Sequence, residues 1–226
     1  MPGNPAPVKT RVPSLTLNSY NKLRLRLSDR YNAREASPPW SAQFNADLAD
    51  MMQSAQACCN GLAEIIDAEI MNDTAAFNMW RIDRNAIDLM NHLISNTHIL
   101  LNVYNDMPKD FPAKKKIAYA ETLVDCMVTM TCLDPSRQIA AGVPTPLLTL
   151  LGDMYALDPA RAHDTMNFAA RRLQRALHVY GRFEPEDEDT QEHLSLMLLT
   201  MAYQRKERAV NPTAHVATLL YDPKVN

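Results

Sequence analysis

The residues whose types and spacing are best suited to binding a ligand lie in the segment 159–182. This segment has the pattern of an amphipathic helix. At 100° per residue, four cationic side chains fall within about 60° of one another. These four residues, hereafter the cationic stripe, are Arg171, Arg175, His178 and Arg182. Phe168 and Arg172 lie beside the stripe, and the opposite face is apolar: Met166, Ala169, Leu173, Leu177 and Tyr180.

A cation about once per helical turn can follow a phosphate backbone, while Phe168 is placed to stack on a base. The pattern therefore indicates a nucleic-acid or other anion contact. Two simpler interpretations stay open. The stripe can be a solvated polar face, or it can pair within the chain with residues 184–192, which contain six acids.

The adjacent pair His163 and Asp164 suggests a second kind of chemistry. All-α metal phosphohydrolases bind metal through such a pair, with a further His upstream and an Asp downstream. His92 or His98 could serve upstream, but Asp222 is nearly terminal and no convincing downstream Asp follows on a predicted helix. We therefore interpret Asp164 as a first-turn acid that the helix dipole favours. An all-α metal phosphohydrolase is the third of our functional hypotheses.

The sequence contains no catalytic motif of the common enzyme classes. It has no Gly-rich phosphate loop, no GxSxG, no HExxH and no paired ExxH of di-iron bundles. We therefore predict a protein without enzymatic activity, cofactor or metal. The four cysteines form no CxxC, and we expect them to be reduced and mostly buried, in a reducing compartment.

The composition predicts a folded chain whose charges are unevenly distributed. Hydrophobic residues make up 46% of the 226, and only 5 Gly accompany 15 Pro, which suits helices joined by Pro-containing loops. The net charge of −3 is the sum of blocks: residues 1–34 hold seven bases and one acid, and residues 35–80 hold seven acids and no Lys or Arg. No apolar run reaches the ~18 residues of a membrane span, so we predict no membrane partner.

Two long apolar seams predict the centre of the fold. Residues spaced alternately by four and three form the first seam: Phe44, Leu48, Met51, Ala55, Cys58, Leu62 and Ile65. The second comprises Trp80, Ile87, Met90, Ile94, Leu101 and Tyr104. We expect helices over about 41–71 and 74–104, the first capped by Ser41, packed as a long antiparallel hairpin.

Shorter helices are predicted to complete a multi-helix bundle. The third helix runs from near Pro112 to Leu133, a short one follows Pro146, and a longer one ends at Gly181 as its C′ residue. Another runs from the acidic segment to about 209, and a last short one covers residues 211–220. In "LDPSR" and "LDPAR", Asp134 and Asp158 have the position of N-caps before a first-turn Pro.

The N-terminal 40 residues differ from the rest. Apolar and basic residues alternate with the period of a strand in the segment Lys22, Leu23, Arg24, Leu25, Arg26, Leu27. A short β-hairpin, a short helix and an irregular extended segment are all compatible with it. We divide the chain into a basic, Pro-rich arm (1–40) and a helical domain (41–226), which comprises the hairpin (41–106) and the shorter helices (112–226).

These features favour a non-enzymatic structural protein that self-associates through its arm. The cationic stripe adds possible RNA or DNA binding, in the general manner of a viral coat or nucleocapsid subunit. This is an architectural analogy. The alternative is a helical adaptor or accessory subunit of a larger complex. The expected partners are a homo-oligomer or larger assembly, and the expected location is the cytoplasm or a virion.

Overall fold

The computed structural model describes residues 25, 29, 40–67, 84–135, 138, 142, 144–183 and 186–210. Within these residues the chain forms helices and no strand, which confirms the all-α class. The helices are α2 (Ala42–Asp67), α4 (Arg84–Asn105), α5 (Ala113–Leu133), α7 (Pro144–Leu157), α8 (Pro159–Phe183) and α9 (Glu188–Val210).

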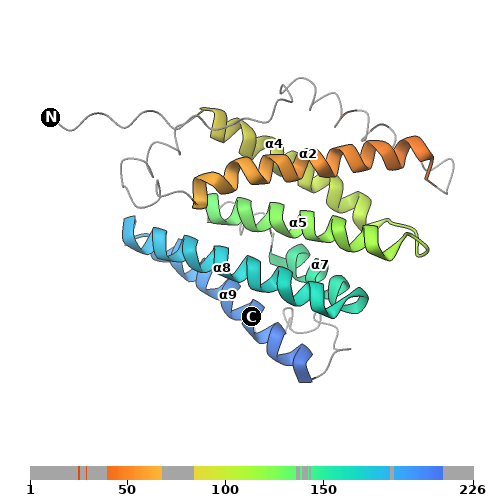
Figure 1. The fold of residues 1–226 in the computed structure, drawn as a ribbon. Helices are drawn as coiled ribbons and strands as arrows, with labels where there is room; N and C mark the ends of the chain where they lie inside the picture. The colour runs from red at the N-terminus through yellow and green to blue at the C-terminus, as the bar shows by residue number, and fades with distance from the viewer. Residues whose placement is uncertain are drawn as a thin grey trace.

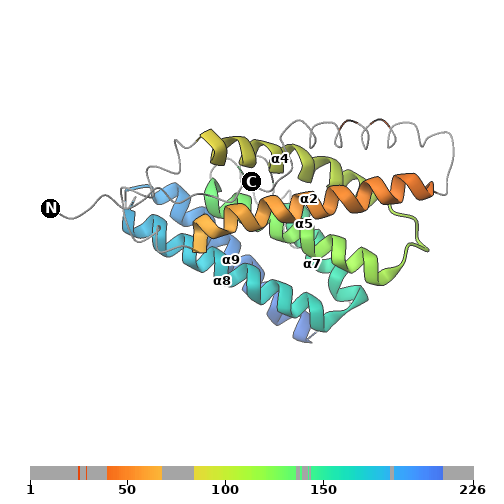
Figure 2. The same cartoon turned by 45° about the horizontal axis from the view of Figure 1, so that its top comes forward.

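Helix α5 occupies the middle of this bundle (Figure 1). It packs against α2, α4, α7 and α8, whereas α9 packs along α8. In both views α2 and α4 lie on one side of α5, and α8 and α9 lie on the other (Figure 2). The bundle therefore has one helix surrounded by neighbours and outer helices that each keep an exposed face.

The burial of α5 follows from this position. Twelve of its 21 residues are buried, and they extend around the helix rather than along one stripe. Its polar Thr129 and Thr131 are also fully buried, and Thr131 donates a hydrogen bond to the Met127 carbonyl at 2.7 Å. The Cys126 Sγ lies 3.2 Å from the Cys59 Sγ of α2. All four cysteines are buried, as predicted, and none forms a disulfide.

Side-chain caps begin several helices where the sequence places them. Ser41 Oγ accepts a hydrogen bond from the Phe44 amide at 3.0 Å, and Asp158 Oδ1 accepts one from the Arg161 amide at 3.1 Å. Both N-caps were predicted. Asp187 Oδ1 accepts from the Thr190 amide at 3.1 Å and caps α9 in the same way.

Two predicted helix boundaries are wrong. Helix α7 begins at Pro144 rather than after Pro146, because proline fits the first turn of a helix, where its missing N–H is not needed. Helix α8 continues through Gly181 to Phe183, so Gly181 is not a C′ residue. Gly142 is the one described glycine with a positive φ, at 74°. At Gly181 a Cβ would lie 3.5 Å from Gln191 Oε1, so the glycine lies where α9 closely approaches α8.

The first apolar seam is confirmed over its described side chains. Six of its members are at most 6% exposed: Phe44, Leu48, Met51, Ala55, Cys58 and Leu62. The second seam is partly wrong, because Ile87 is 42% exposed while Leu93, Leu100 and Val103 are fully buried. Helix α4 contacts both α2 and α5, and this double contact turns its buried face away from Ile87.

Several predictions fall outside the described residues. These are the connection of the expected hairpin (68–83), Trp80, and the last short helix (211–220). Helices α2 and α4 do pack together, but the hairpin itself stays a prediction. In the arm, Leu25 and Asp29 are described; both are helical and exposed. The three alternatives for the arm, a short β-hairpin, a short helix and an extended segment, stay predictions.

Truncating buried leucines in α2 and α4 tests the packing. Leu62→Ala and Leu93→Ala each remove a fully buried side chain, so we expect each to lower the free energy of unfolding by ~2–5 kcal/mol. The control Ile87→Ala removes an exposed side chain of the same helix and should cost less than ~1 kcal/mol. Urea unfolding followed by circular dichroism measures all three. Equal losses at Leu93 and Ile87 would contradict the assigned face of α4.

Alkaline pH tests the packing independently. Burial raises the pKa of the Cys59 thiol above its ordinary value of 9.0, and the neighbouring Cys126 adds to this shift. Burial also raises the pKa of Tyr104, helped by the Asp153 carboxylate, and that of Tyr119. These groups hold their protons more tightly in the folded chain than in the unfolded one. Their contribution to stability is therefore complete below about pH 9 and is lost as the pH rises through the folded-state pKa values.

We thus expect the free energy of unfolding to fall between about pH 9 and pH 10.5. Cys59→Ala should make that fall shallower, because one of the titrating groups is gone. Urea unfolding at several pH values measures both slopes. A free energy of unfolding that stays constant over this range would contradict the burial of these groups.

Candidate functional site

The side of the bundle formed by α8 contains the predicted site residues, and α5 and α2 hold α8 in place. Most of the predicted apolar face of α8 is buried, with Met166, Ala169, Leu173 and Tyr180 at most 2% exposed. Leu177 is partly buried against the same core. Tyr180 Oη donates a hydrogen bond to the Leu133 carbonyl at 3.0 Å, which ties this face to the end of α5.

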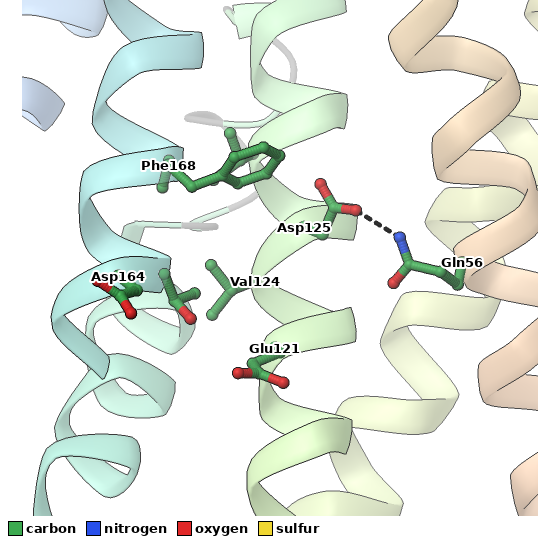
Figure 3. Close-up of a pocket in the computed structure, with 9 residues that line it drawn as sticks. Gln56, Glu121, Val124, Asp125, Asp164 and Phe168 are labelled. Atoms are coloured by element: carbon green, nitrogen blue, oxygen red, sulfur yellow. Dashed lines mark hydrogen bonds between the residues drawn. The ribbon is translucent and has the colours of Figure 1, made fainter. Parts of the chain in front are cut away.

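A polar cluster joins α2, α5 and α8 around the Asp125 carboxylate. Arg172 Nη1 lies 2.5 Å from Asp125 Oδ1. Gln56 Nε2 donates to Asp125 Oδ2 at 2.6 Å (Figure 3). Arg172 Nη1 also donates to Thr129 Oγ1 at 3.0 Å. The Arg172 and Asp125 side chains are only 11% and 13% exposed. A nearly buried charge pair of this kind is stable because each carboxylate oxygen has its own donor.

A second ion pair lies one turn earlier on α5. Arg161 Nε donates to Glu121 Oε1 at 2.8 Å, and Arg161 Nη2 contacts Glu121 Oε2. This two-point contact has the fork geometry that arginine prefers with carboxylates. The pair is more exposed, at 40% for Arg161 and 29% for Glu121. Together with Arg172–Asp125 it connects α8 to α5 at two levels.

An open groove of about 290 Å³ runs between these helices (Figure 3). Its lining comes from α2 (Gln56), α5 (Glu121, Val124, Asp125, Val128) and α8 (Asp164, Thr165, Phe168, Ala169). Arginines already neutralise Glu121 and Asp125, and the lining contains no His or Cys. The groove therefore lies between three helices and combines apolar side chains with two carboxylates that are held in ion pairs.

The proposed metal pair lies at the edge of this region. Asp164 is exposed and lines the groove, and His163 is partly buried on the same turn of α8. Within the ranges that the structure describes, no three His, Cys, Asp or Glu side chains come together as metal ligands would. His92 and His98 belong to α4, and the packing of α8 is chiefly with α5, α7 and α9.

The cationic stripe faces outward. All four of its members are exposed along α8. Arg171 Nε donates to the Asn167 carbonyl one turn earlier, at 3.3 Å. The structure therefore brings these predicted residues together on one surface. The predicted arm residues, Leu25 apart, lie outside the described part of the chain.

The two residues beside the stripe have different environments. Arg172 turns toward Asp125, and its guanidinium carbon lies 4.5 Å from the centre of the Phe168 ring. Phe168 is still 44% exposed. Arg172 is thus held by α5 and by the ring, so its charge belongs to the packing of α8. Phe168 keeps part of its surface open next to the stripe.

Sequence reasoning did not identify Asp125 as the partner of Arg172. One signal was present. Asp125 stands inside the apolar run "LVDCMVTMTCL", where a carboxylate needs a buried partner. The identity of that partner depends on how α5 and α8 pack, because the two residues lie 47 positions apart.

Comparison of this chain with protein-family models, with curated proteins and with solved structures finds no match. The described helices include none with the length and apolar character of a membrane span. The geometry of the described residues is therefore the basis for any functional proposal.

Breaking the buried ion pair should strongly destabilise the fold. Asp125→Ala leaves the Arg172 charge nearly buried without a counter-charge, so we expect a loss of ~3–5 kcal/mol in the free energy of unfolding. Asp164→Ala removes an exposed carboxylate from the same groove and should change it by at most ~0.5 kcal/mol. Urea unfolding compares the two variants.

The double variant Asp125→Ala with Arg172→Met removes both charges and keeps the length of the side chain on α8. It should recover part of the stability lost in Asp125→Ala, because no unpaired charge is left. If Asp125→Ala and Asp164→Ala behave alike, the pair does not hold α8 against α5.

Proposed function

We propose that this protein is a non-enzymatic, self-associating structural protein that binds a nucleic-acid backbone through α8. One observation supports the proposal. The cationic stripe of α8 is exposed, and the opposite face of the helix is buried in the core. From residue 171 to residue 182 the helix rises ~16 Å. One strand of a duplex carries about five phosphates over that length, so the stripe has room for several phosphate contacts.

The distribution of cationic side chains on α8 supports this proposal. Arg161 and Arg172 form ion pairs with α5, and the arginines of the stripe are exposed on the outside of the bundle. Contacts of this kind to phosphates position a nucleic acid without reading its sequence. Binding is therefore expected to be salt-dependent and tolerant of sequence. Self-association through the arm, with Lys22 to Leu27 as contacts, remains part of the proposal.

A helical adaptor subunit is the second candidate. Leu196 and Leu199 on α9 are 60% and 67% exposed, which favours a protein contact on that helix. Nucleic-acid binding by the purified protein at low salt separates the two candidates, because an adaptor is not expected to bind nucleic acid.

Neutralising the stripe should weaken nucleic-acid binding and flatten its salt dependence. In the variant Arg171→Gln, Arg175→Gln, Arg182→Gln, the slope of log affinity against log salt should become shallower by about 2–3 units for a duplex. Fluorescence anisotropy with a labelled duplex and a labelled single strand, over a salt series, measures this slope. The circular dichroism spectrum should be unchanged, because glutamine favours helix as arginine does.

A matched control removes the same three charges elsewhere. Lys109, Lys114 and Lys115 are exposed near the start of α5, and changing all three to Gln should leave the slope nearly unchanged. Phe168→Ala should weaken binding further, by ~1–3 kcal/mol, only for a single strand whose base stacks on the ring. If the parent protein binds neither probe at low salt, the nucleic-acid proposal is wrong and the adaptor remains.

A further inference from the structure

A pair of cysteine thiols lies between α2 and α5 inside the core. The Cys59 Sγ is 3.2 Å from the Cys126 Sγ, and both side chains are fully buried. The two residues lie 67 positions apart in the sequence, so the packing of α2 on α5 brings them together. Neither the proposed nucleic-acid binding nor the proposed self-association makes use of this contact.

The thiol pair is close to the geometry of a disulfide. A disulfide bond is ~2.05 Å long, so the two sulfur atoms need to approach each other by only ~1.2 Å. Side-chain rotation and small shifts of the helices supply a movement of this size. Cys58 is rotated by about 100° from Cys59 around α2, and Cys132 lies about 9 Å beyond Cys126 along α5. Helical geometry therefore favours one pair among the four thiols.

The groove between α2, α5 and α8 reaches the neighbours of this pair. Gln56 and Asp125 line the groove and are hydrogen-bonded to each other at 2.6 Å (Figure 3). Gln56 lies about one turn before Cys59 on α2, and Asp125 directly precedes Cys126 on α5. A molecule as small as hydrogen peroxide fits a groove of about 290 Å³ and can approach the thiols from there.

We propose that Cys59 and Cys126 form a reversible disulfide that crosslinks α2 to α5 when the protein is exposed to hydrogen peroxide. The thiol contact and the adjacent groove are the observations that support it. A long segment of chain separates the two cysteines, so the bridge restricts the unfolded chain strongly and should stabilise the fold. The crosslink does not depend on the cationic stripe or on the arm.

The reaction takes place in two steps. The thiolate of one cysteine attacks an oxygen of hydrogen peroxide and the O–O bond breaks, which gives a sulfenic acid and a hydroxide that takes up the thiol proton as water. The sulfur of the second cysteine then attacks the sulfenic sulfur, the S–O bond breaks, and a second water leaves with the remaining thiol proton. Two thiols and one peroxide thus give one disulfide and two waters. A dithiol reductant reverses the bridge by thiol–disulfide exchange.

Burial makes this response slow and confines it to one chain. It raises the pKa of the Cys59 thiol, so little thiolate is present at neutral pH and a brief exposure leaves the pair reduced. The same burial keeps a sulfenic acid next to its partner thiol and away from the thiols of other molecules. The expected product is therefore a bridge within one subunit and not a disulfide-linked dimer.

Peptide mapping of the oxidised protein tests the pairing. The reduced full chain is treated with hydrogen peroxide at neutral pH, its remaining thiols are alkylated, and it is digested with trypsin without reduction. The segment 35–81 contains Cys58 and Cys59, and the segment 117–137 contains Cys126 and Cys132. Mass spectrometry should find these two segments linked, and dithiothreitol should separate them. The linked protein should have a Tm higher by about 5–10 °C.

Substitutions identify the two sulfur atoms. Cys59→Ala and Cys126→Ala should each abolish the link, whereas the matched controls Cys58→Ala and Cys132→Ala should keep it. Circular dichroism of each reduced variant checks that the variant is folded. The double variant Cys58→Ala with Cys132→Ala retains only the proposed pair and should form the link as the parent does. It tests the pairing even if a substitution at Cys59 unfolds the chain.

Three results would overturn the proposal. A link that persists in folded Cys59→Ala belongs to another pair of cysteines. A folded parent chain that forms no link, and whose thiols react only after urea unfolds it, uses these cysteines for packing alone. A linked chain with an unchanged or lower Tm is strained by the bridge, so the bridge does not stabilise the contact between α2 and α5.

Discussion

The burial of α5 is the constraint on which the rest of the bundle depends. A helix with neighbours on α2, α4, α7 and α8 has little surface left for water, and twelve of its residues are buried. A charge on the buried part of such a helix needs a partner from a neighbour, because an isolated buried charge is too costly. Glu121 and Asp125 meet this need with two arginines of α8 and with Gln56 of α2.

These charge pairs also determine how α8 is rotated. Arg161 and Arg172 must face α5, and the apolar residues between them pack into the same side of the bundle. The remaining cations of α8 are then directed outward. The exposed stripe is thus a consequence of the packing of α5, and a change at Asp125 would disturb both the fold and the presentation of Arg171 and Arg175.

The sequence allowed local features to be predicted well and long-range ones poorly. The caps at Ser41 and Asp158, the first apolar seam and the two faces of α8 depend on residues within a few turns of one another. The buried face of α4 depends on two neighbouring helices at once, and so Ile87 was assigned to the core and Leu93 was missed. The pairing of Arg172 with Asp125 depends on the packing of α5 against α8, which no spacing within either helix reveals.

A net charge of −3 makes a single stripe of three arginines and one histidine a weak site for a polyanion. Association of two subunits would change this balance without adding a charge. A two-fold dimer, such as the proposed self-association would form, carries two copies of the stripe. A nucleic acid that reaches both binds the second stripe intramolecularly, and such linkage can raise affinity by about 10²–10⁴-fold. The proposed self-association and the proposed nucleic-acid binding are therefore linked, because the number of stripes that one nucleic acid can reach depends on the assembly.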